Sequence, residues 1–178
     1  MSDLFRELPL SSRTPRDESG VTGDWRGQLA DVVGEAARLL ARVDDDSRSP
    51  RTRAFLVESG LDRERSEDDL TGLADAVRSG RRRRIRDLSR AVTATLVLAR
   101  DTGGAVSLAP LTFGAVALYR TTAAPLPIRA VVAGRTLRSS DHGWEFGHGP
   151  LLEDSSERIV AFLCGVSENA PGGGSRPR

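Results

Sequence analysis

Residues 135–165 read RTLRSSDHGWEFGHGPLLEDSSERIVAFLCG and contain the densest set of structural signals in the chain. Leu137 lies in a predicted strand that runs into the turn Asp141-His142-Gly143. The aspartate can cap this turn, and the glycine can adopt the positive φ that a tight turn requires. In the returning strand, Trp144 and Phe146 alternate with a glutamate and therefore point to one face. The pattern predicts two strands joined by a turn, with two aromatic side chains on one side.

A predicted helix closes this stretch. Two glycines and a proline at residues 147–150 end the second strand, and Asp154 with Glu157 has the spacing of a capping box. The helix covers residues 155–164 and turns four apolar side chains inward, Ile159, Val160, Phe162 and Leu163. Upstream, three alternating apolar residues predict one more strand, Ile128, Ala130 and Val132. Residues 127–168 are therefore expected to form a small strand-turn-strand-helix module.

Residues 23–126 are expected to form a helical part. Apolar residues at three- and four-residue spacing predict helices over residues 25–43, 49–60, 66–80 and 81–102. The mixed apolar run 107–119 fits either a helix from Pro110 or a pair of short strands, and the helix is favoured. The acidic run 44–46 is interpreted as a solvated loop. The expected fold class is α+β, with four to five N-terminal helices followed by the small module.

Both ends of the chain are expected to be disordered. Residues 1–22 and 169–178 mix proline, glycine and charged residues without apolar periodicity. Four apolar residues of the N-terminal arm offer an alternative, a short docking motif: Leu4, Phe5, Leu8 and Leu10.

Composition restricts the classes of function. The 178 residues include 26 basic residues, all arginine, and 25 acidic residues, for a net charge of +1. This balance argues against a general polyanion binder, and the exclusive use of arginine is typical of an actinobacterial, GC-rich genome. One cysteine excludes an intramolecular disulfide framework, and two histidines leave few zinc ligands. No cofactor, metal site, secretory signal or membrane span is predicted, and a reducing cytoplasm is the expected location.

An arginine cluster is the first candidate interaction site. It consists of Arg81, Arg82, Arg83, Arg84 and Arg86. Positive charge at a helix N-terminus is self-repelling unless an anion meets it, and arginine pairs with carboxylates and phosphates alike. We favour intramolecular pairing or a solvated face over a DNA contact, because the chain has no recognition motif and no basic net charge.

A second candidate cluster lies in the turn of the module, at Asp141, His142, Trp144, Glu145 and His148. The acidic and histidine side chains are the only concentrated acid-base or ligand groups of the chain. We interpret the histidines as exposed turn residues, with an acid-base pair or a metal site as the alternative, since zinc requires three or four ligands. Cys164 is interpreted as a buried small apolar residue and not as a nucleophile, because it lies at the wrong helix end.

The order of Asp141, Trp144, Gly147, Gly149-Pro150 and a helix ending at Gly165 resembles one known family. The resemblance is to the C-terminal domain of actinobacterial mycothiol-dependent maleylpyruvate isomerases, over about residues 127–165. It implies a sterol-carrier-like domain following a DinB-like four-helix bundle. In that family the bundle binds a divalent metal through histidines and a carboxylate, whereas residues 1–126 of this chain contain no histidine. The family's metal-dependent transferase chemistry therefore transfers to no residue of this chain.

These observations predict a non-catalytic binding or protein-interaction module. Its partner would be a protein, a second copy of the chain or a small apolar ligand. The alternatives from other classes are a DNA-associated regulator using residues 81–90 and a diverged thiol-dependent enzyme related to maleylpyruvate isomerase.

Overall fold

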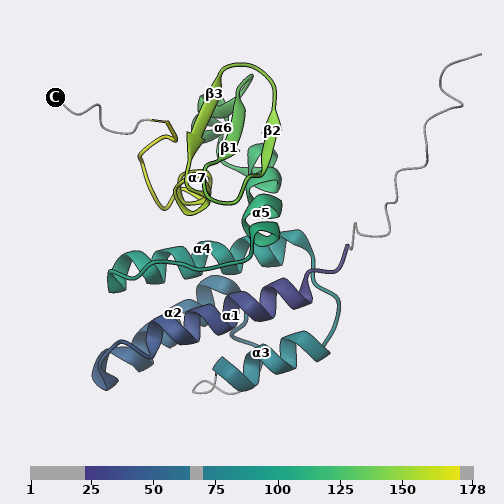
Figure 1. The fold of residues 1–178 in the computed structure, drawn as a ribbon. Coiled ribbons are helices and arrows are strands. Elements are labelled where there is room, and N and C mark those ends of the chain that lie inside the picture. Colours follow the sequence, from purple (N-terminus) through teal and green to yellow (C-terminus); the bar gives the residue numbers. More distant parts are fainter. Residues whose placement is uncertain (1–22, 65–69, 173–178) are drawn as a thin grey trace, which may run out of the picture.

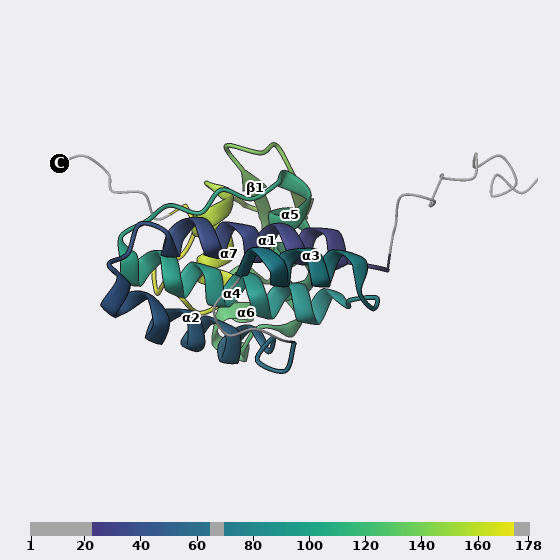
Figure 2. The same cartoon turned by 90° about the horizontal axis from the view of Figure 1, so that it is seen from below.

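Four helices form the N-terminal bundle. The computed structural model describes residues 23–64 and 70–172. The bundle consists of α1 (Arg26–Leu40), α2 (Asp45–Ser59), α3 (Leu70–Ser79) and α4 (Ile85–Thr102). Helix α1 packs on α3 and α4, and α2 packs on α4, so that the four lie side by side (Figure 2).

Helix α5 (Pro110–Ala123) connects the bundle to the C-terminal module and rises steeply from α4 in Figure 1. The module consists of α6 (Leu126–Val132), β1 (Thr136–Ser139), β2 (Glu145–Gly147), β3 (Leu151–Asp154) and α7 (Ser156–Leu163). The α+β prediction is thus confirmed, with five helices preceding the module in the part of the chain that the structure describes. The mixed run 107–119 resolves in favour of the helix that begins at Pro110.

The three strands form one sheet in the order β2-β1-β3. Strand β1 pairs antiparallel with β2 and parallel with β3, so Leu137 lies between Phe146 and Leu152. Thr136, at the start of β1, is paired with Gly147 of β2 on one side and with Leu151 of β3 on the other. The segment between β2 and β3 therefore crosses from one side of β1 to the other at this point. Sequence analysis missed β3, since a four-residue strand directly after Gly-Pro carries no alternation to detect.

Gly149 makes this crossing possible. Its φ is +115°, and a Cβ atom there would collide with the carbonyl oxygen of Gly134. Only glycine combines this backbone conformation with so close an approach of two chain segments.

One continuous core extends from the bundle into the module. The bundle contributes Val33 and Val92, helix α5 contributes Phe113, and the module contributes Leu137 and Ile159. All five side chains are buried. Inward residues predicted for the last helix, 159, 160, 162 and 163, are buried as expected. Helix α7 packs on α5, which makes α5 the shared wall of both parts.

The strand predicted over residues 128–132 is wrong, because these residues form α6. Ile128 and Val132 are four residues apart, and this spacing places two side chains on the same face of a helix and also on the same face of a strand. Pro125 and Pro127 then decide the outcome, since proline is favoured at the start of a helix, where its missing N–H costs nothing.

The acidic run 44–46 is not a solvated loop. Asp44 is the N-cap of α2, and Asp45 and Asp46 occupy its first turn, where carboxylates favour the positive end of the helix dipole. The helix predicted to begin at Ser49-Pro50 therefore starts earlier and contains Pro50. In α7 the N-cap is Ser155, whose hydroxyl accepts the N–H of Arg158, and the predicted cap Asp154 instead ends β3.

Some predictions concern the ends of the described ranges. The N-terminal arm 1–22 and Ser66, where the third helix was predicted to begin, lie outside the described residues. Residues 169–172, assigned by sequence to a disordered tail, are described, and Pro171 is buried. Gly172 lies close to Leu152 of β3, so this part of the predicted tail packs against the sheet.

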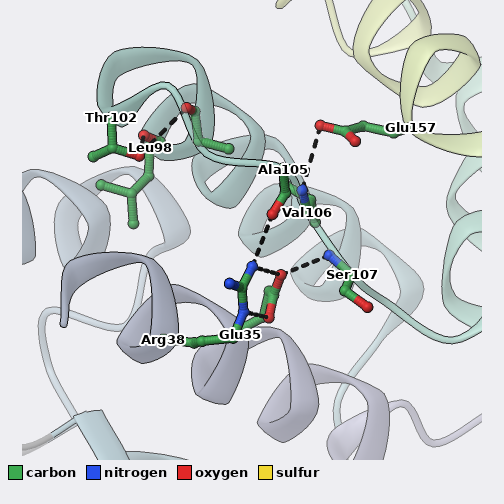
Figure 3. A network of polar contacts seen from close by, with 9 residues as sticks. Glu35, Arg38, Leu98, Thr102, Ala105, Val106, Ser107 and Glu157 are labelled. Atoms are coloured by element: carbon green, nitrogen blue, oxygen red, sulfur yellow. Dashed lines mark hydrogen bonds and ion pairs between the residues drawn. The ribbon is translucent and has the colours of Figure 1, made fainter. Parts of the chain in front are cut away.

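A polar network fixes the segment that leads into α5 (Figure 3). Glu35 of α1 is 7% exposed and forms a two-point ion pair with Arg38, with both N···O distances 2.6 Å. The same carboxylate accepts the Ser107 N–H at 2.6 Å, and Arg38 donates to the Ala105 carbonyl at 2.8 Å. From the module, Glu157 accepts the Val106 N–H at 3.5 Å. The segment is thus held from both sides, which sets the position of α5.

Candidate ligand-binding groove

The module presents two stacked aromatic rings toward α5. Gly143 turns the chain with φ +68°, as predicted, and delivers Trp144 to the start of β2. The rings of Trp144 and Phe146 are 5.3 Å apart at an angle of 13°. A Cβ atom on Gly114 would lie 3.4 Å from the Trp144 ring, so glycine at this point of α5 lets the indole lie against the helix. The prediction that both aromatic residues share one face is confirmed by this stacking.

Helix α5 supplies the floor of a groove beside these rings. Gly114 and Ala115 are small, whereas Leu111 and Leu118 are 59% and 56% exposed. Large apolar side chains with this exposure on one helix face mark an interaction site. Tyr119 continues the same face.

The opposite wall comes from the start of the bundle, where Gly23, Trp25 and Ile85 line the groove. The backbone N–H of Trp25 donates to the Arg83 carbonyl at 3.0 Å, and the Asp24 carboxylate accepts the backbone N–H of Arg83 at 3.2 Å. The backbone of the arginine segment therefore holds this wall in place.

The complete groove has a volume of about 660 Å³ and a largely apolar lining. The chain is poor in aromatic residues, with two tryptophans, one tyrosine and five phenylalanines. Both tryptophans and the tyrosine line this groove, together with Phe146. Ligand sites typically have this size and an apolar, aromatic lining.

The arginine cluster is mostly engaged within the chain. Arg83 is 5% exposed and forms an ion pair with Glu64, which also pairs with Arg81 at 3.2 Å. Arg82 lies 3.9 Å from Asp24. Burial raises the pKa of Asp24, but hydrogen bonds from Arg83 and Arg26 outweigh this effect, and the net pKa is lowered. Intramolecular pairing is therefore confirmed for Arg81 and Arg83, with partners that sequence analysis did not identify.

The remaining arginines lie at the start of α4 and not within a longer helix. Arg84 precedes the helix, and its N–H donates to Asp87 at 3.1 Å. Residues 81–84 thus form an extended connection, and the predicted helix start at residue 81 is four residues too early. Arg86 faces a separate pocket between α4 and α5.

Asp141 organises the start of α7. Its Oδ1 accepts the Ser156 N–H and hydroxyl, both at 2.9 Å, and the Ser139 hydroxyl at 2.6 Å. Burial raises the pKa of Asp141, but the hydrogen bonds from Ser139 and Ser156 prevail and lower it from 3.8 to about 2. The carboxylate therefore joins the turn to α7 and also lies near the positive end of the helix dipole.

The other members of the turn cluster do not converge on one site. Glu145 forms an ion pair with Arg138 at 2.6 Å across β1 and β2. The His142 ring packs against Phe113 with centroids 5.7 Å apart, whereas His148 is exposed beside Phe146 and Arg135. Among the described residues, no three histidine, cysteine or acidic side chains lie together as metal ligands. Trp144 is the one member that lines the groove.

Replacing Asp141 by alanine is expected to lower the free energy of unfolding by about 1–2 kcal/mol at neutral pH, allowing for the exposure of the residue. Because its pKa is depressed in the folded state, this stabilisation is present above pH 3.8 and is lost as the pH falls toward 2. Urea unfolding at neutral and acidic pH measures the difference. Glu153→Ala, which removes an exposed carboxylate of the same module, is the control; an equal loss in both variants would contradict the assigned role.

Cys164 ends α7 and is half-buried against the core. Its packing among apolar residues agrees with the predicted apolar role, although burial is incomplete.

The described helices include none that is long and apolar enough to cross a membrane.

Sequence analysis missed most of the groove. Trp144 was identified as a candidate. The other lining residues were assigned to the apolar stripes of predicted helices or to the mixed apolar run 107–119, and they include Trp25, Ile85, Leu111, Leu118 and Tyr119. A usable signal exists in α5, where apolar residues occur on every side of the helix and exceed what a single buried face needs.

Comparisons of the chain with protein-family models, curated proteins and solved structures find no significant match.

Proposed function

We propose that this chain is a non-catalytic binding module and that its groove takes an apolar small molecule. The observation that supports the proposal is the concentration of both tryptophans and the tyrosine in one open, apolar groove. Rigid aromatic side chains give large contact area at low cost in conformational entropy. Residues from the segment that precedes α1 and from α4, α5 and β2 meet there, so the site depends on the complete fold.

The polar candidates support a binding role over a catalytic one. The carboxylate of Asp141 accepts hydrogen bonds from Ser139 and Ser156, and Glu145 forms an ion pair with Arg138. The pairing of Arg81 and Arg83 with Glu64 likewise leaves less charge for DNA than the sequence indicates. The proposal places the protein in the cytoplasm, in keeping with its single cysteine.

From the resemblance to maleylpyruvate isomerases, the proposal takes only a shared ancestry of the module and none of the enzymes' chemistry. The module has a third strand and a helix before its first strand, whereas the resemblance rests on residues of the turn and the last helix. A protein partner that covers the groove is the competing occupant, and it would use the same exposed leucines, Leu111 and Leu118.

Titration of the full chain with N-phenylnaphthylamine, an uncharged probe that fluoresces in apolar surroundings, tests the proposal. We expect saturable binding that Leu118→Gln weakens about fivefold to tenfold, because the variant removes one apolar contact from the groove. Leu118 is exposed, so the fold should be unaffected.

Leu126→Gln is the matched control, since Leu126 is 70% exposed and does not line the groove. Equal affinities for the two variants, or no saturable binding by the unmodified chain, would contradict the proposal. Capture of a protein partner that Leu118→Gln releases, without any probe binding, would favour the competing occupant.

A further inference from the structure

A second pocket adjoins the groove in the angle between α4 and α5. It has a volume of about 560 Å³. Arg86 and Arg90 lie on one face of α4, one turn apart, and Arg120 approaches from α5. Glu58 of α2 is the one carboxylate in the lining, against three guanidinium groups. The pocket is therefore electropositive.

Two of these arginines are held by the surrounding structure. Arg90 donates to the carbonyl oxygens of Glu58 at 2.7 Å and Val57 at 2.9 Å, at the end of α2. Arg120 donates through Nη2 to the Thr93 hydroxyl at 3.2 Å. Positioned guanidinium groups lose less entropy on binding an oxyanion than mobile ones.

Donors remain for a ligand. The Nε of Arg120 is buried and has no hydrogen-bond partner among the described residues. Arg86 is exposed and forms no hydrogen bond or ion pair within residues 23–64 and 70–172. A buried N–H without an acceptor is costly, and an anion that draws Arg120 into a new bond would remove that cost.

Tyr119 joins this pocket to the groove, because it lines both. Around α5, Leu118 faces the groove, Tyr119 lies at the boundary and Arg120 faces the second pocket. On α4, Ile85 lines the groove and Arg86 lines the pocket. An apolar surface thus passes directly into a cationic one on both helices.

We propose that the ligand is an organic anion whose apolar body lies in the groove and whose oxyanion head group binds Arg86 and Arg120. The assignment rests on the proposed function of the groove and adds the charge of the ligand to it. Arginine pairs with carboxylate, phosphate and sulfonate oxygens through parallel N–H···O bonds, so the head group is an oxyanion of this kind. Arg90, already bound to α2, contributes long-range attraction.

Two probes with the same aromatic body test the assignment. Anilinonaphthalene sulfonate carries a sulfonate, and N-phenylnaphthylamine does not. The full chain is expected to bind the sulfonate more tightly, and Arg86→Gln and Arg120→Gln should each weaken that binding about tenfold while leaving the uncharged probe unaffected. Added salt should weaken only the charged probe. Arg100→Gln, on the same helix but outside both pockets, is the control.

The outcomes separate this inference from the proposed function. If the uncharged probe binds and the sulfonate binds no more tightly, or if neither Arg86→Gln nor Arg120→Gln weakens binding of the sulfonate, the anion site is wrong and the groove stands. If neither probe binds, the proposed function fails as well. Arg86 is exposed, so loss of discrimination in Arg86→Gln does not reflect unfolding, and thermal melting is the check that Arg120→Gln remains folded. Displacement of the sulfonate probe by naphthoate or by naphthyl phosphate, but not by naphthol, would support the head-group assignment and show which anion fits better.

Discussion

Replacing Phe113 by alanine is expected to lower the free energy of unfolding by about 3–5 kcal/mol. The ring is 2% exposed and sits on α5, the helix that packs against both α4 and α7. It also contacts the His142 ring of the turn. Its removal leaves a cavity where the bundle and the module share their core, and neither part can collapse into it without moving the other. Urea or thermal unfolding measures the loss.

Leu111→Ala provides the matched control on the same helix. Leu111 is exposed, so the change should alter the free energy of unfolding by no more than about 0.5 kcal/mol. A small effect of Phe113→Ala, comparable to that of the control, would mean that the two parts of the chain do not share one core. Two separate unfolding transitions in the unmodified protein would lead to the same conclusion.

Replacing Glu35 by alanine is expected to cost about 2–3 kcal/mol at neutral pH. The carboxylate is buried, pairs with Arg38 and accepts the Ser107 N–H, as Figure 3 shows. Without it, the Ser107 N–H loses its acceptor, and among the described residues Arg38 keeps only the Ala105 carbonyl. The variant therefore loosens the segment that positions α5, and with it the floor of the groove.

The pH dependence of this effect has a definite sign. Burial raises the pKa of Glu35, but hydrogen bonds from Arg38 and the Ser107 N–H outweigh burial, so the pKa lies below 4.5. The folded state thus holds the proton less tightly than the unfolded chain, and the stabilisation is present above pH 4.5 and lost as the pH falls through the lowered pKa. The difference between unmodified protein and Glu35→Ala should shrink in acid.

Two neighbouring carboxylates keep this test specific. Asp31 lies on α1, as Glu35 does, and forms an exposed ion pair with Arg78 of α3, so Asp31→Asn should have little effect at any pH. Burial raises the pKa of Glu157, and the charges of Asp141 and Glu35 add to this, so its own contribution runs in the opposite direction with pH. A Glu35→Ala effect that persists unchanged in acid would show that packing, and not the ion pair, accounts for it.

The fold was predictable wherever a local sequence pattern fits only one type of secondary structure. The apolar stripes of α1 and α4 and the Gly143 turn are local signals, and the structure agrees with them. The strand predicted over residues 128–132 was wrong because the spacing of Ile128 and Val132 fits both a helix and a strand. The strand prediction rested on alternation alone and did not use Pro125 and Pro127, which favour the start of a helix. Strand β3 was not predicted, because its pairing with β1 depends on the chain crossing at Gly149, which only the assembled structure reveals.

The candidate site was predictable only in part, because it is assembled from distant segments. Trp144 was found through its alternation with Phe146, a local pattern. Trp25 and Ile85 lie 119 and 59 positions earlier in the chain than Trp144, and nothing local connects them to it. The intramolecular partners of the arginines could not be predicted for the same reason, since only the packing of the bundle brings Glu64 and Asp24 close to them.

The two tryptophans allow the most direct test of the groove as the ligand site. The chain has two indole N–H groups, on Trp25 and Trp144, and both residues line the groove from opposite walls. In amide and indole N–H correlation spectra of the labelled full chain, added N-phenylnaphthylamine is expected to shift both indole signals along one saturable curve. The backbone signal of Gly103, at the opposite end of α4 from the groove residue Ile85, should stay in place. Saturable binding of the probe with neither indole signal moving would contradict the groove as the binding site.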